Sequence, residues 1–284
     1  MEGTRLQGDP AFLDHGPPPR AVSEGEPSAP VARPYIALEQ VSLRFQSEHR
    51  QVQALSDVDL GVDEGEFVAL LGPTGCGKSS LLRLISDLIP PTSGVIKIRG
   101  EPPSAARQAV QFGFVFQEPA LLPWRTAIEN IQLPLEVVNY PIEQRQARCQ
   151  ALLDSVRLLK FKDAYPHELS GGMKQRVAIV RALAWNAPIL LMDEPFSALD
   201  ELTRGQLQDD LLQIWSRERK TALFVTHSIS EAVYLADRVV VMSPHPGRIK
   251  TILSPGLPRP RSEDMRETPE FLRWTRMARE TLRS

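Results

Sequence analysis

The sequence predicts an α/β fold built around a sheet of buried, parallel strands. Short apolar runs of the kind found in such strands recur along the chain, and stretches of helical periodicity separate most of them. A glycine-rich turn joins the first run directly to a helical stretch, which is a third sign of this fold class. The apolar runs occupy residues 67–71, 112–116, 189–192, 222–226 and 239–242.

The glycine-rich turn reads Gly-Pro-Thr-Gly-Cys-Gly-Lys-Ser over residues 72–79 and matches the phosphate-binding loop pattern. A strand before it and a helix after it direct backbone N–H groups and a helix N-terminus at one point, which suits a polyphosphate. We expect Lys78 to bind the β and γ phosphates and the Ser79 hydroxyl to ligate Mg²⁺. A chance match is the alternative, and the strand–turn–helix context disfavours it. The expected nucleotide contacts here are Gly72, Pro73, Thr74, Gly75, Cys76, Gly77, Lys78, Ser79 and Ser80.

Composition limits the possible roles of the chain. The 284 residues carry a formal net charge of -2, which gives no general attraction to nucleic acid. The two cysteines, Cys76 and Cys149, show no metal-ligand spacing, so we expect a reducing, cytosolic compartment. No apolar run approaches the roughly 18 residues of a membrane span, and no secretory signal is recognisable. We therefore expect that the chain does not cross a membrane by itself.

The N-terminal part begins with a proline-rich stretch, residues 1–34, which predicts a disordered tail, with a partner-binding segment as the alternative. Strands are expected over residues 36–45 and 55–62, with a polar loop over 46–53 between them. A further strand is expected at 95–98. Phe45 ends the first of these strands, where it could stack on a nucleotide base or belong to the core; the sequence alone favours the core.

Residues 118–187 contain no strand pattern, which predicts a helical subdomain inserted between two strands of the sheet. Within it, residues 143–159 place Ala147, Ala151, Leu152, Val156 and Leu159 on one face of a predicted helix. A later helix is expected to begin at Ser170, a good N-cap, followed by Gly171 and Gly172, which leave the backbone N–H groups bare. This second helix start is either an anion site or only a helix cap.

Polar residues follow the predicted strands at their carboxyl ends, where an α/β sheet places its ligand. Gln117 is placed to face the ligand, although a surface glutamine is the alternative. Asp193 is the expected second Mg²⁺ position, and Glu194 is placed to polarise a water that attacks the γ-phosphate, unless the charges only end the strand. A lone histidine is usually structural, but His227 ends a strand on the same side and is expected to contact the γ-phosphate.

The remaining elements follow in order. A tight turn is expected over residues 197–200, a helix over 201–217, a closing strand over 248–253 and a terminal helix over 270–282.

In order and kind, these motifs resemble those of the ATP-binding subunits of ABC transporters. The matching motifs are the phosphate loop at 72–79, Gln117, Leu-Ser-Gly-Gly at 169–172, Asp193-Glu194, Ser-Ala-Leu-Asp at 197–200 and His227. The resemblance covers residues 35–255, with a helical subdomain at about 118–187, and leaves the tail 1–34 and a helical extension at 256–284. It implies a P-loop NTPase (RecA-like) core with an antiparallel β subdomain and an inserted helical subdomain.

The resemblance also implies the role of each residue. Phe45 stacks on the adenine of ATP, Ser79 and Gln117 ligate Mg²⁺, and Asp193 holds the ion through water. Glu194 is the catalytic carboxylate, aided by His227 and Lys78. Two subunits pair head to tail as a homodimer, so that one subunit closes over the phosphates held by the other, and hydrolysis reopens the pair. The closing residues are Ser170, Gly171 and Gly172, and Asp200 belongs to the same nucleotide-binding set.

A narrower resemblance is to the importers of nitrate, sulfonates and taurine. It is carried by residues 115–126, 225–239 and 243–248, with Ser228 replacing the more usual acidic residue. It implies an ATPase at the cytosolic face of the membrane, a separate transmembrane permease and an extracytoplasmic solute-binding protein. Related members carry pyrimidine precursors or bicarbonate. Residues 121–124 either line the permease groove or pack inside the helical subdomain.

Two other functions compete with this prediction. An ABC-type ATPase of DNA repair or translation usually carries two ATP domains or a long coiled-coil insertion, and this chain has one phosphate loop and no long heptad run. We therefore expect no nucleic-acid partner. A nucleotide-binding regulator without hydrolysis is opposed by the intact Glu194.

Overall fold

The computed structural model describes residues 34–47, 50–197 and 199–283. Contacts between residues group 33–284 into one unit separate from residues 1–32, and the fold is described for this unit alone. The predicted proline-rich tail, apart from Pro34, lies outside the described residues, as do residues 48–49 and Ala198 of the Ser-Ala-Leu-Asp turn. In the described ranges no helix is long and apolar enough to cross a membrane.

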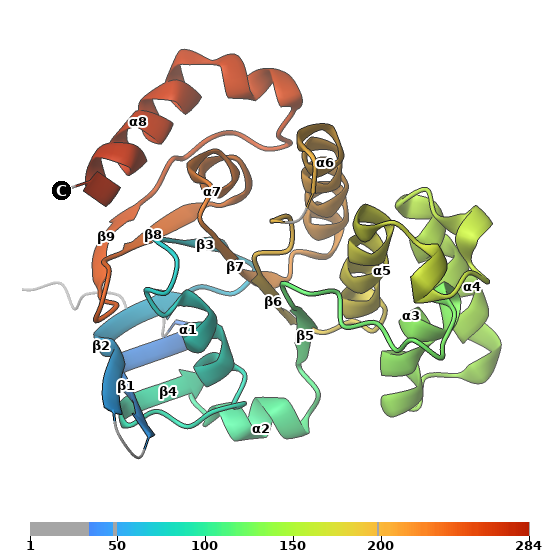
Figure 1. Ribbon diagram of the computed structural model, residues 1–284, viewed down its shortest axis with the longest axis horizontal. Coiled ribbons are helices and arrows are strands. Elements are labelled where there is room, and N and C mark those ends of the chain that lie inside the picture. Colours follow the sequence, from blue (N-terminus) through green and yellow to red (C-terminus); the bar gives the residue numbers. More distant parts are fainter. Residues whose placement is uncertain (1–33, 48–49, 198, 284) are drawn as a thin grey trace, which may run out of the picture. The chain divides into compact units, whose positions relative to one another are not determined.

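A six-stranded sheet contains the buried strands that the sequence predicts. Its members are β3 (Phe67–Leu71), β5 (Phe112–Val115), β6 (Ile189–Asp193), β7 (Thr221–Thr226), β8 (Arg238–Met242) and β9 (Ile249–Leu253). The strand order is β5-β6-β7-β3-β8-β9, and only the last pair is antiparallel (Figure 1). Strands β3, β6 and β7 are buried along their whole length, which explains why their sequences are apolar rather than alternating.

A second, antiparallel sheet has the order β2-β1-β4. Its strands are β1 (Ile36–Ser47), β2 (Arg50–Val62) and β4 (Ser93–Ile98). The polar loop expected over residues 46–53 is wrong, because Gln46 pairs with Gln51 and most of this stretch is strand. Its side chains are polar because this end of the hairpin lies at the surface, where periodicity gives no signal.

The two faces of β3 belong to two separate hydrophobic clusters, because successive side chains in a strand point to opposite faces. Phe67 and Leu71 pack with residues of α6 (Glu201–Glu218) and α7 (Ile229–Leu235). Val68 and Leu70 pack with α1 (Lys78–Ile85) and the antiparallel sheet. The phosphate-loop helix is therefore held between the two sheets.

The short helix α2 (Pro103–Gln108) precedes β5.

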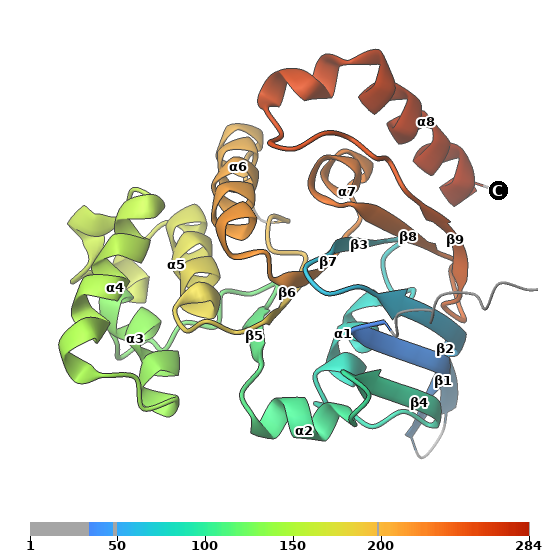
Figure 2. The same cartoon turned by 180° about the vertical axis from the view of Figure 1, so that it is seen from behind.

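The predicted helical subdomain consists of helices that lie together beside β5 (Figures 1 and 2). Its members are α3 (Ala127–Val137), α4 (Ile142–Ser155), two 3₁₀ turns (Leu159–Phe161 and Pro166–Glu168) and α5 (Gly171–Leu183). The predicted apolar face of α4 is largely wrong: Cys149 and Leu153 are buried, whereas Ala147 and Ala151 are exposed. The helix ends at Ser155, because Arg157 adopts a left-handed backbone with φ of 58°, and Leu159 belongs to the turn that follows.

The C-terminal segment continues from β9 through a 3₁₀ turn (Glu263–Glu267) to helix α8 (Pro269–Arg283), where the sequence predicts a terminal helix. Both views show α8 lying over α7 (Figure 2). Phe271 and Ala278 are its buried residues, and they join the same hydrophobic cluster as α6 and α7. The extension is thus packed on the core.

Candidate active site

The carboxyl ends of four neighbouring strands meet at one edge of the large sheet. The residue pairs that align there are Val115 with Met192, Asp193 with Val225, and Leu71 with Thr226. Because parallel strands end at the same edge, the residues that follow them are brought together. Gly72, Gln117, Glu194 and His227 therefore lie along this edge, as the sequence predicts.

The phosphate loop depends on glycine at two positions for different reasons. Gly77 has φ of 99°, and a Cβ there would lie 2.6 Å from Cδ2 of Leu55. A Cβ on Gly72 would lie 2.8 Å from Sγ of Cys76, so the loop closes tightly on itself. Gly77 is also the residue before α1, so the loop ends at a helix N-terminus. This is the expected geometry of a phosphate cradle.

The ammonium group of Lys78 lies inside the loop. Its Nζ donates to the backbone oxygens of Gly72 at 2.8 Å and Pro73 at 2.9 Å. The residue is only 4% exposed. A buried cation held by weak carbonyl dipoles is well placed to exchange them for phosphate oxygens, with which its hydrogen bonds are stronger.

Ser79 and Asp193 form the part of the site that fits a magnesium ion. The Ser79 hydroxyl donates to Oδ1 of Asp193 at 2.8 Å, joining α1 to the end of β6. Burial raises the pKa of the Asp193 carboxyl, and the bond from Ser79 partly opposes this. Hydroxyl and carboxylate oxygens are hard donors of the type that Mg²⁺ takes together with phosphates. Gln117 is exposed, two residues beyond Val115, the last residue of β5.

Glu194 and His227 are in direct contact. Nδ1 of His227 lies 3.0 Å from Oε2 of Glu194, and their side chains are 55% and 14% exposed, respectively. Glu194 has a left-handed backbone with φ of 44°, and its N–H donates to the Val225 carbonyl. The histidine is thus not a satisfied core residue. His227 faces solvent, whereas Glu194 is largely buried beside it.

A buried network that sequence reasoning missed supports His227 from behind. Thr226 Oγ1 donates to Oε2 of Glu231 at 2.5 Å and accepts from the Ser228 N–H at 2.9 Å. These bonds join the residue before His227 to the residue after it and to α7. Burial raises the pKa of Glu231, whose Oε1 lies 3.6 Å from Nε of Arg204. Arg204 also donates to the Leu199 carbonyl at 2.7 Å. The network therefore connects the Ser-Ala-Leu-Asp turn to the start of α7.

The first turn of α5 is a capped helix start, and the anion site that the Ser170 motif also allows stays a prediction. Ser170 is the N-cap, and its side chain accepts from the Met173 N–H at 3.3 Å. Gly171 is exposed and has no atom within 4 Å of a Cβ position. Among the described residues, no hydrogen bond joins this turn to the phosphate loop. The helix is capped at Ser170, and Gly171 lies exposed in its first turn.

Two further predicted site residues lie at the surface. Phe45 is 47% exposed, so its assignment to the core is wrong and the stacking alternative is left. Asp200 is the N-cap of α6, accepting from the Thr203 N–H at 3.0 Å, and this bond lowers the pKa of its carboxyl.

The loop between β8 and β9 supports the phosphate loop, which the sequence did not indicate. A Cβ on Gly247 would lie 1.9 Å from the carbonyl oxygen of Cys76. Gly247 is also bonded to β2, donating to the Ala54 carbonyl at 2.9 Å and accepting from the Ser56 N–H at 3.0 Å. In sequence, Gly247 reads only as a turn residue. Its actual role is to permit close approach of two backbones.

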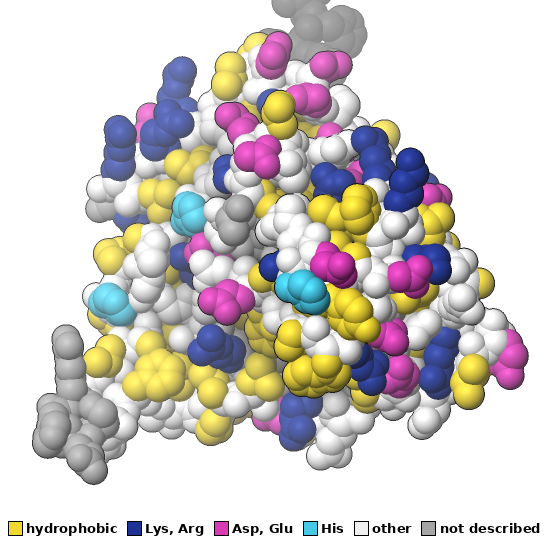
Figure 3. All heavy atoms as spheres, turned by 45° about the vertical axis from the view of Figure 1, so that its right-hand side comes forward, with side chains coloured by type: hydrophobic (Ala, Val, Ile, Leu, Met, Phe, Trp, Pro, Cys, Tyr) yellow, Lys and Arg dark blue, Asp and Glu magenta, His cyan; other side chains and the backbone are white. Residues whose placement is uncertain are grey.

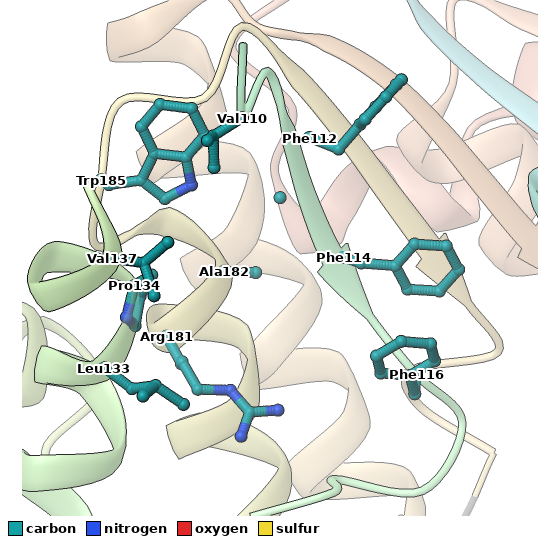
Figure 4. Close-up of a pocket in the computed structure, with 11 residues that line it drawn as sticks. Val110, Phe112, Phe114, Phe116, Leu133, Pro134, Val137, Arg181, Ala182 and Trp185 are labelled. Atoms are coloured by element: carbon teal, nitrogen blue, oxygen red, sulfur yellow. The ribbon is translucent and has the colours of Figure 1, made fainter. Parts of the chain in front are cut away.

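An apolar pocket of about 310 Å³ lies between β5 and the helical subdomain (Figure 4). Phe112, Phe114 and Phe116 line one side, and Leu133, Pro134 and Val137 of α3 line the other. The rings of Phe114 and Phe116 stack with centroids 4.2 Å apart. The lining of this pocket is thus largely apolar.

Arg181 of α5 also lines this pocket and anchors the segment after Gln117. Its guanidinium donates to the carbonyls of Pro119 at 2.9 Å and Ala120 at 2.8 Å, and burial lowers the pKa of Arg181. Residues 121–124 differ in burial, and the permease-facing alternative stays a prediction. Leu121 packs against the core of the helical subdomain, whereas Trp124 is 70% exposed.

Comparison with known proteins supports this geometry. A family profile described as ABC transporter matches residues 55–197. An uncharacterised ABC transporter ATP-binding protein of Methanocaldococcus jannaschii is 46% identical over 242 residues, 84% of this chain and 88% of the relative. A taurine import ATP-binding protein of Rhizobium johnstonii is 47% identical over 75% of this chain and 81% of the relative. An aliphatic sulfonates import ATP-binding protein of Bacillus cereus is 42% identical over 80% and 89%, respectively.

Solved structures agree with these relatives. The dimeric ATP-binding cassette MJ0796, in a post-hydrolysis state with ADP and Pi, gives a TM-score of 0.69 at 34% identity. The match covers 77% of this chain and 98% of that one. The predicted fold class and the assignment as an ATPase are therefore confirmed. This chain belongs to the ABC transporter family.

Proposed function

We propose that this chain is the ATP-hydrolysing subunit of an importer for a small solute such as a sulfonate, taurine or nitrate. It works as a homodimer on a separate transmembrane permease, at the cytoplasmic face of the membrane, and an extracytoplasmic solute-binding protein delivers the cargo. The observation that carries the proposal is the likeness, at 42% and 47% identity, to relatives named for sulfonate and taurine import. The solute class rests on these names.

Nucleotide binding is assigned to the phosphate loop and to Phe45. The exposed ring of Phe45 stacks on adenine, while residues 72–80 surround the phosphates with N–H groups and the Lys78 charge. Ser79, Gln117 and, through water, Asp193 would hold Mg²⁺, which neutralises phosphate charge when bound. The hydrogen bond between Ser79 and Asp193 keeps two of these three groups together before the ion arrives.

Hydrolysis is assigned to the Glu194–His227 pair. Glu194 accepts a proton from the attacking water, and its left-handed backbone follows directly on the last residue of β6. His227 orients Glu194 through the 3.0 Å contact and binds the γ-phosphate. The backbone N–H groups and Lys78 stabilise the charge that develops on the phosphate oxygens.

Dimer formation is needed to complete this site. Ser170 and Gly171 are exposed at the first turn of α5, and among the described residues no hydrogen bond joins this turn to the phosphate loop of the same subunit. A second subunit placed head to tail would bring this turn and Asp200 onto the phosphates. The dimeric state of the cassette MJ0796, at 34% identity, supports this arrangement.

Permease docking is assigned to the pocket beside β5 and to Trp124. The loop that carries Trp124 is fixed by the buried Asn130, whose Nδ2 donates to the carbonyls of Arg125 and Thr126 and whose Oδ1 accepts from the Leu122 N–H. An exposed aromatic side chain on a loop that is held by hydrogen bonds is a favourable anchor for a partner helix.

The charge on one face of the molecule does not favour the competing nucleic-acid functions. On the face shown in Figure 3, hydrophobic side chains are interspersed with both basic and acidic ones. The face therefore carries no stripe of one sign such as phosphate backbones require.

The test is a pull-down of the tagged chain from gently solubilised membranes. We expect a multi-span permease to be recovered. The complex, reconstituted with its binding protein, is then assayed for ATP hydrolysis stimulated by sulfonates, taurine, nitrate, bicarbonate and pyrimidine precursors. Recovery with ribosomes or DNA and without a permease would overturn the importer proposal but leave the ATPase assignment intact.

A further inference from the structure

The short helix α7 follows His227 closely in the chain. It begins two residues after His227, with Ser228 as its N-cap, and spans only Ile229–Leu235. The last carbonyl groups of any helix lack partners within the helix and carry the negative end of its dipole. How these carbonyls are satisfied decides how firmly so short a helix is held.

Arg261, in the segment between β9 and α8, satisfies the C-terminal carbonyls of α7. Its guanidinium donates to the carbonyl oxygens of Val233 at 2.8 Å, Ala236 at 2.8 Å and Tyr234. The Arg261 side chain is only 1% exposed. A planar fork of donors matches several carbonyls at once, and its positive charge suits a helix C-terminus.

Arg259 extends this grip to the strand that leads into the phosphate loop. It donates to the Leu235 carbonyl at 2.9 Å and to Oδ1 of Asp237 at 2.7 Å. The other oxygen of Asp237 accepts from the N–H of Phe67, the first residue of β3, at 3.0 Å. The arginine also lies over the ring of Trp215, 4.3 Å from its centroid.

Arg266 contacts both ends of α7. Its guanidinium carbon lies 3.7 Å from the centroid of the Tyr234 ring. Its nitrogens donate to Oγ of Ser230 at 3.4 Å, in the first turn of α7, and to Oε1 of Gln208 on α6 at 2.5 Å. The three arginines together contact α7 from its first turn to its last carbonyl.

We propose that the C-terminal segment 259–266 is a positioning element of the catalytic site, in which Arg261, Arg259 and Arg266 fix α7 and thereby hold His227 against Glu194. The inference rests on the proposed role of His227 in hydrolysis. Loss of these arginine contacts lets α7 shift, which changes the placement of His227. The phosphate loop is still able to bind ATP. The segment therefore acts on turnover and not on nucleotide affinity.

The experiment is a double-mutant cycle on the full-length chain, with kcat for Mg-ATP and the Kd for ATP measured for each protein. Arg261→Ala is expected to lower kcat by about 10- to 100-fold, the cost of misplacing a catalytic group, while the Kd for ATP stays within about twofold. In a His227→Ala background, Arg261→Ala is expected to change kcat by less than about twofold, because both changes remove the same contribution. Arg279→Ala, an exposed position on α8, is the matched control and is expected to leave both constants unchanged.

Equal losses from Arg261→Ala in the two backgrounds, or no loss in the wild type, would overturn the positioning role. If Arg261→Ala does not fold, Arg266→Met takes its place in the same cycle, since it removes the bonds to Ser230 and Gln208 and keeps an apolar side chain against Tyr234. If His227→Ala alone does not lower kcat, the proposed catalytic role of His227 is refuted instead. If His227→Ala lowers kcat and the arginine substitutions do not, only the positioning role of the arginines is refuted.

Discussion

Nδ1 of His227 lies 3.0 Å from Oε2 of Glu194, across the ends of two neighbouring strands, β7 and β6. The two residues are 33 positions apart in the sequence and meet because parallel strands end at the same edge. The contact gives the carboxylate a fixed direction while leaving the histidine exposed. A carboxylate and an imidazole in this arrangement can share the tasks of accepting a proton from water and contacting a phosphate.

Replacing Glu194 by Gln removes the proposed base and keeps the size of the side chain. We expect ATP hydrolysis to fall by about 10²-fold or more, while ATP binding is retained. Because ATP then persists, the dimer is expected to accumulate in its ATP-bound form. Size-exclusion chromatography with Mg-ATP detects the dimer, and a phosphate-release assay measures hydrolysis. Hydrolysis at the normal rate would show that the base has been assigned to the wrong residue.

Replacing Asp193 by Asn is expected to stabilise the chain and to weaken its response to magnesium. Burial raises the pKa of the Asp193 carboxyl in the folded chain. The folded state therefore loses stability relative to the unfolded state as the pH rises above the ordinary Asp pKa and the group ionises. Without nucleotide at neutral pH, we expect a melting temperature about 2–4 °C higher in the variant. This gain should vanish in acid, below the ordinary Asp pKa of about 3.9, where Asp193 is protonated in both the folded and the unfolded chain.

The magnesium dependence of ATP hydrolysis gives the second measurement for this variant. Asn lacks the negative charge that would attract the ion, so a higher magnesium concentration is expected for half-maximal activity. Ser79 can still donate to the amide oxygen, which keeps the local hydrogen bond. An unchanged magnesium requirement would remove Asp193 from the site.

Most of the sheet and its ligand edge could be predicted from the sequence, because buried parallel strands leave continuous apolar runs and their ends carry the chemistry. Asp193, Glu194 and His227 each follow such a run, and the structure places them together. The phosphate loop has both a fixed spacing and a required context. These features are local in sequence, and no long-range pairing needs to be known to find them.

The supporting residues could not be predicted, since their partners are distant in sequence. Arg204, Glu231 and Arg261 look like ordinary solvated charges, and only the fold shows that they satisfy buried groups. Residues 46–53 look like a loop because a hairpin end at the surface needs no apolar residues. Phe45 looks like core because its exposure depends on which face of β1 the rest of the chain covers.

Trp124 tests the permease-docking surface. Trp124→Ala is expected to leave ATP hydrolysis by the isolated chain unchanged and to abolish co-purification with the permease, because an exposed aromatic anchor contributes mainly to binding. Leu272→Ala, on the outer side of α8 and 52% exposed, is the matched apolar control and should not affect recovery. Intact permease binding and transport by the Trp124 variant would show that docking lies elsewhere.

Arg181 tests the connection between this surface and the segment after Gln117. Arg181→Met removes the donors to the Pro119 and Ala120 carbonyls and keeps an apolar stem in the pocket. We expect a loss of about 1.5–3 kcal/mol in the free energy of unfolding, as for charged hydrogen bonds, and loss of solute-stimulated hydrolysis in the reconstituted transporter. Arg276→Met, at an exposed position of α8, should change neither quantity. Full solute stimulation in the Arg181 variant would contradict the connection.

Gly247 and Gly205 form a matched pair of substitution sites. The first tests the close contact of two backbones, and the second tests helix propensity alone. A Cβ on Gly247 meets the Cys76 carbonyl at 1.9 Å, so Gly247→Ala is expected to destabilise the chain by about 1–3 kcal/mol and to weaken ATP binding by displacing the phosphate loop. Gly205 in α6 has no atom within 4 Å of a Cβ, so Gly205→Ala is expected to stabilise by about 0.5–1 kcal/mol and to leave ATP affinity unchanged. Chemical denaturation and nucleotide titration measure both effects. Normal ATP affinity in the Gly247 variant would mean that the loop between β8 and β9 does not support the nucleotide site.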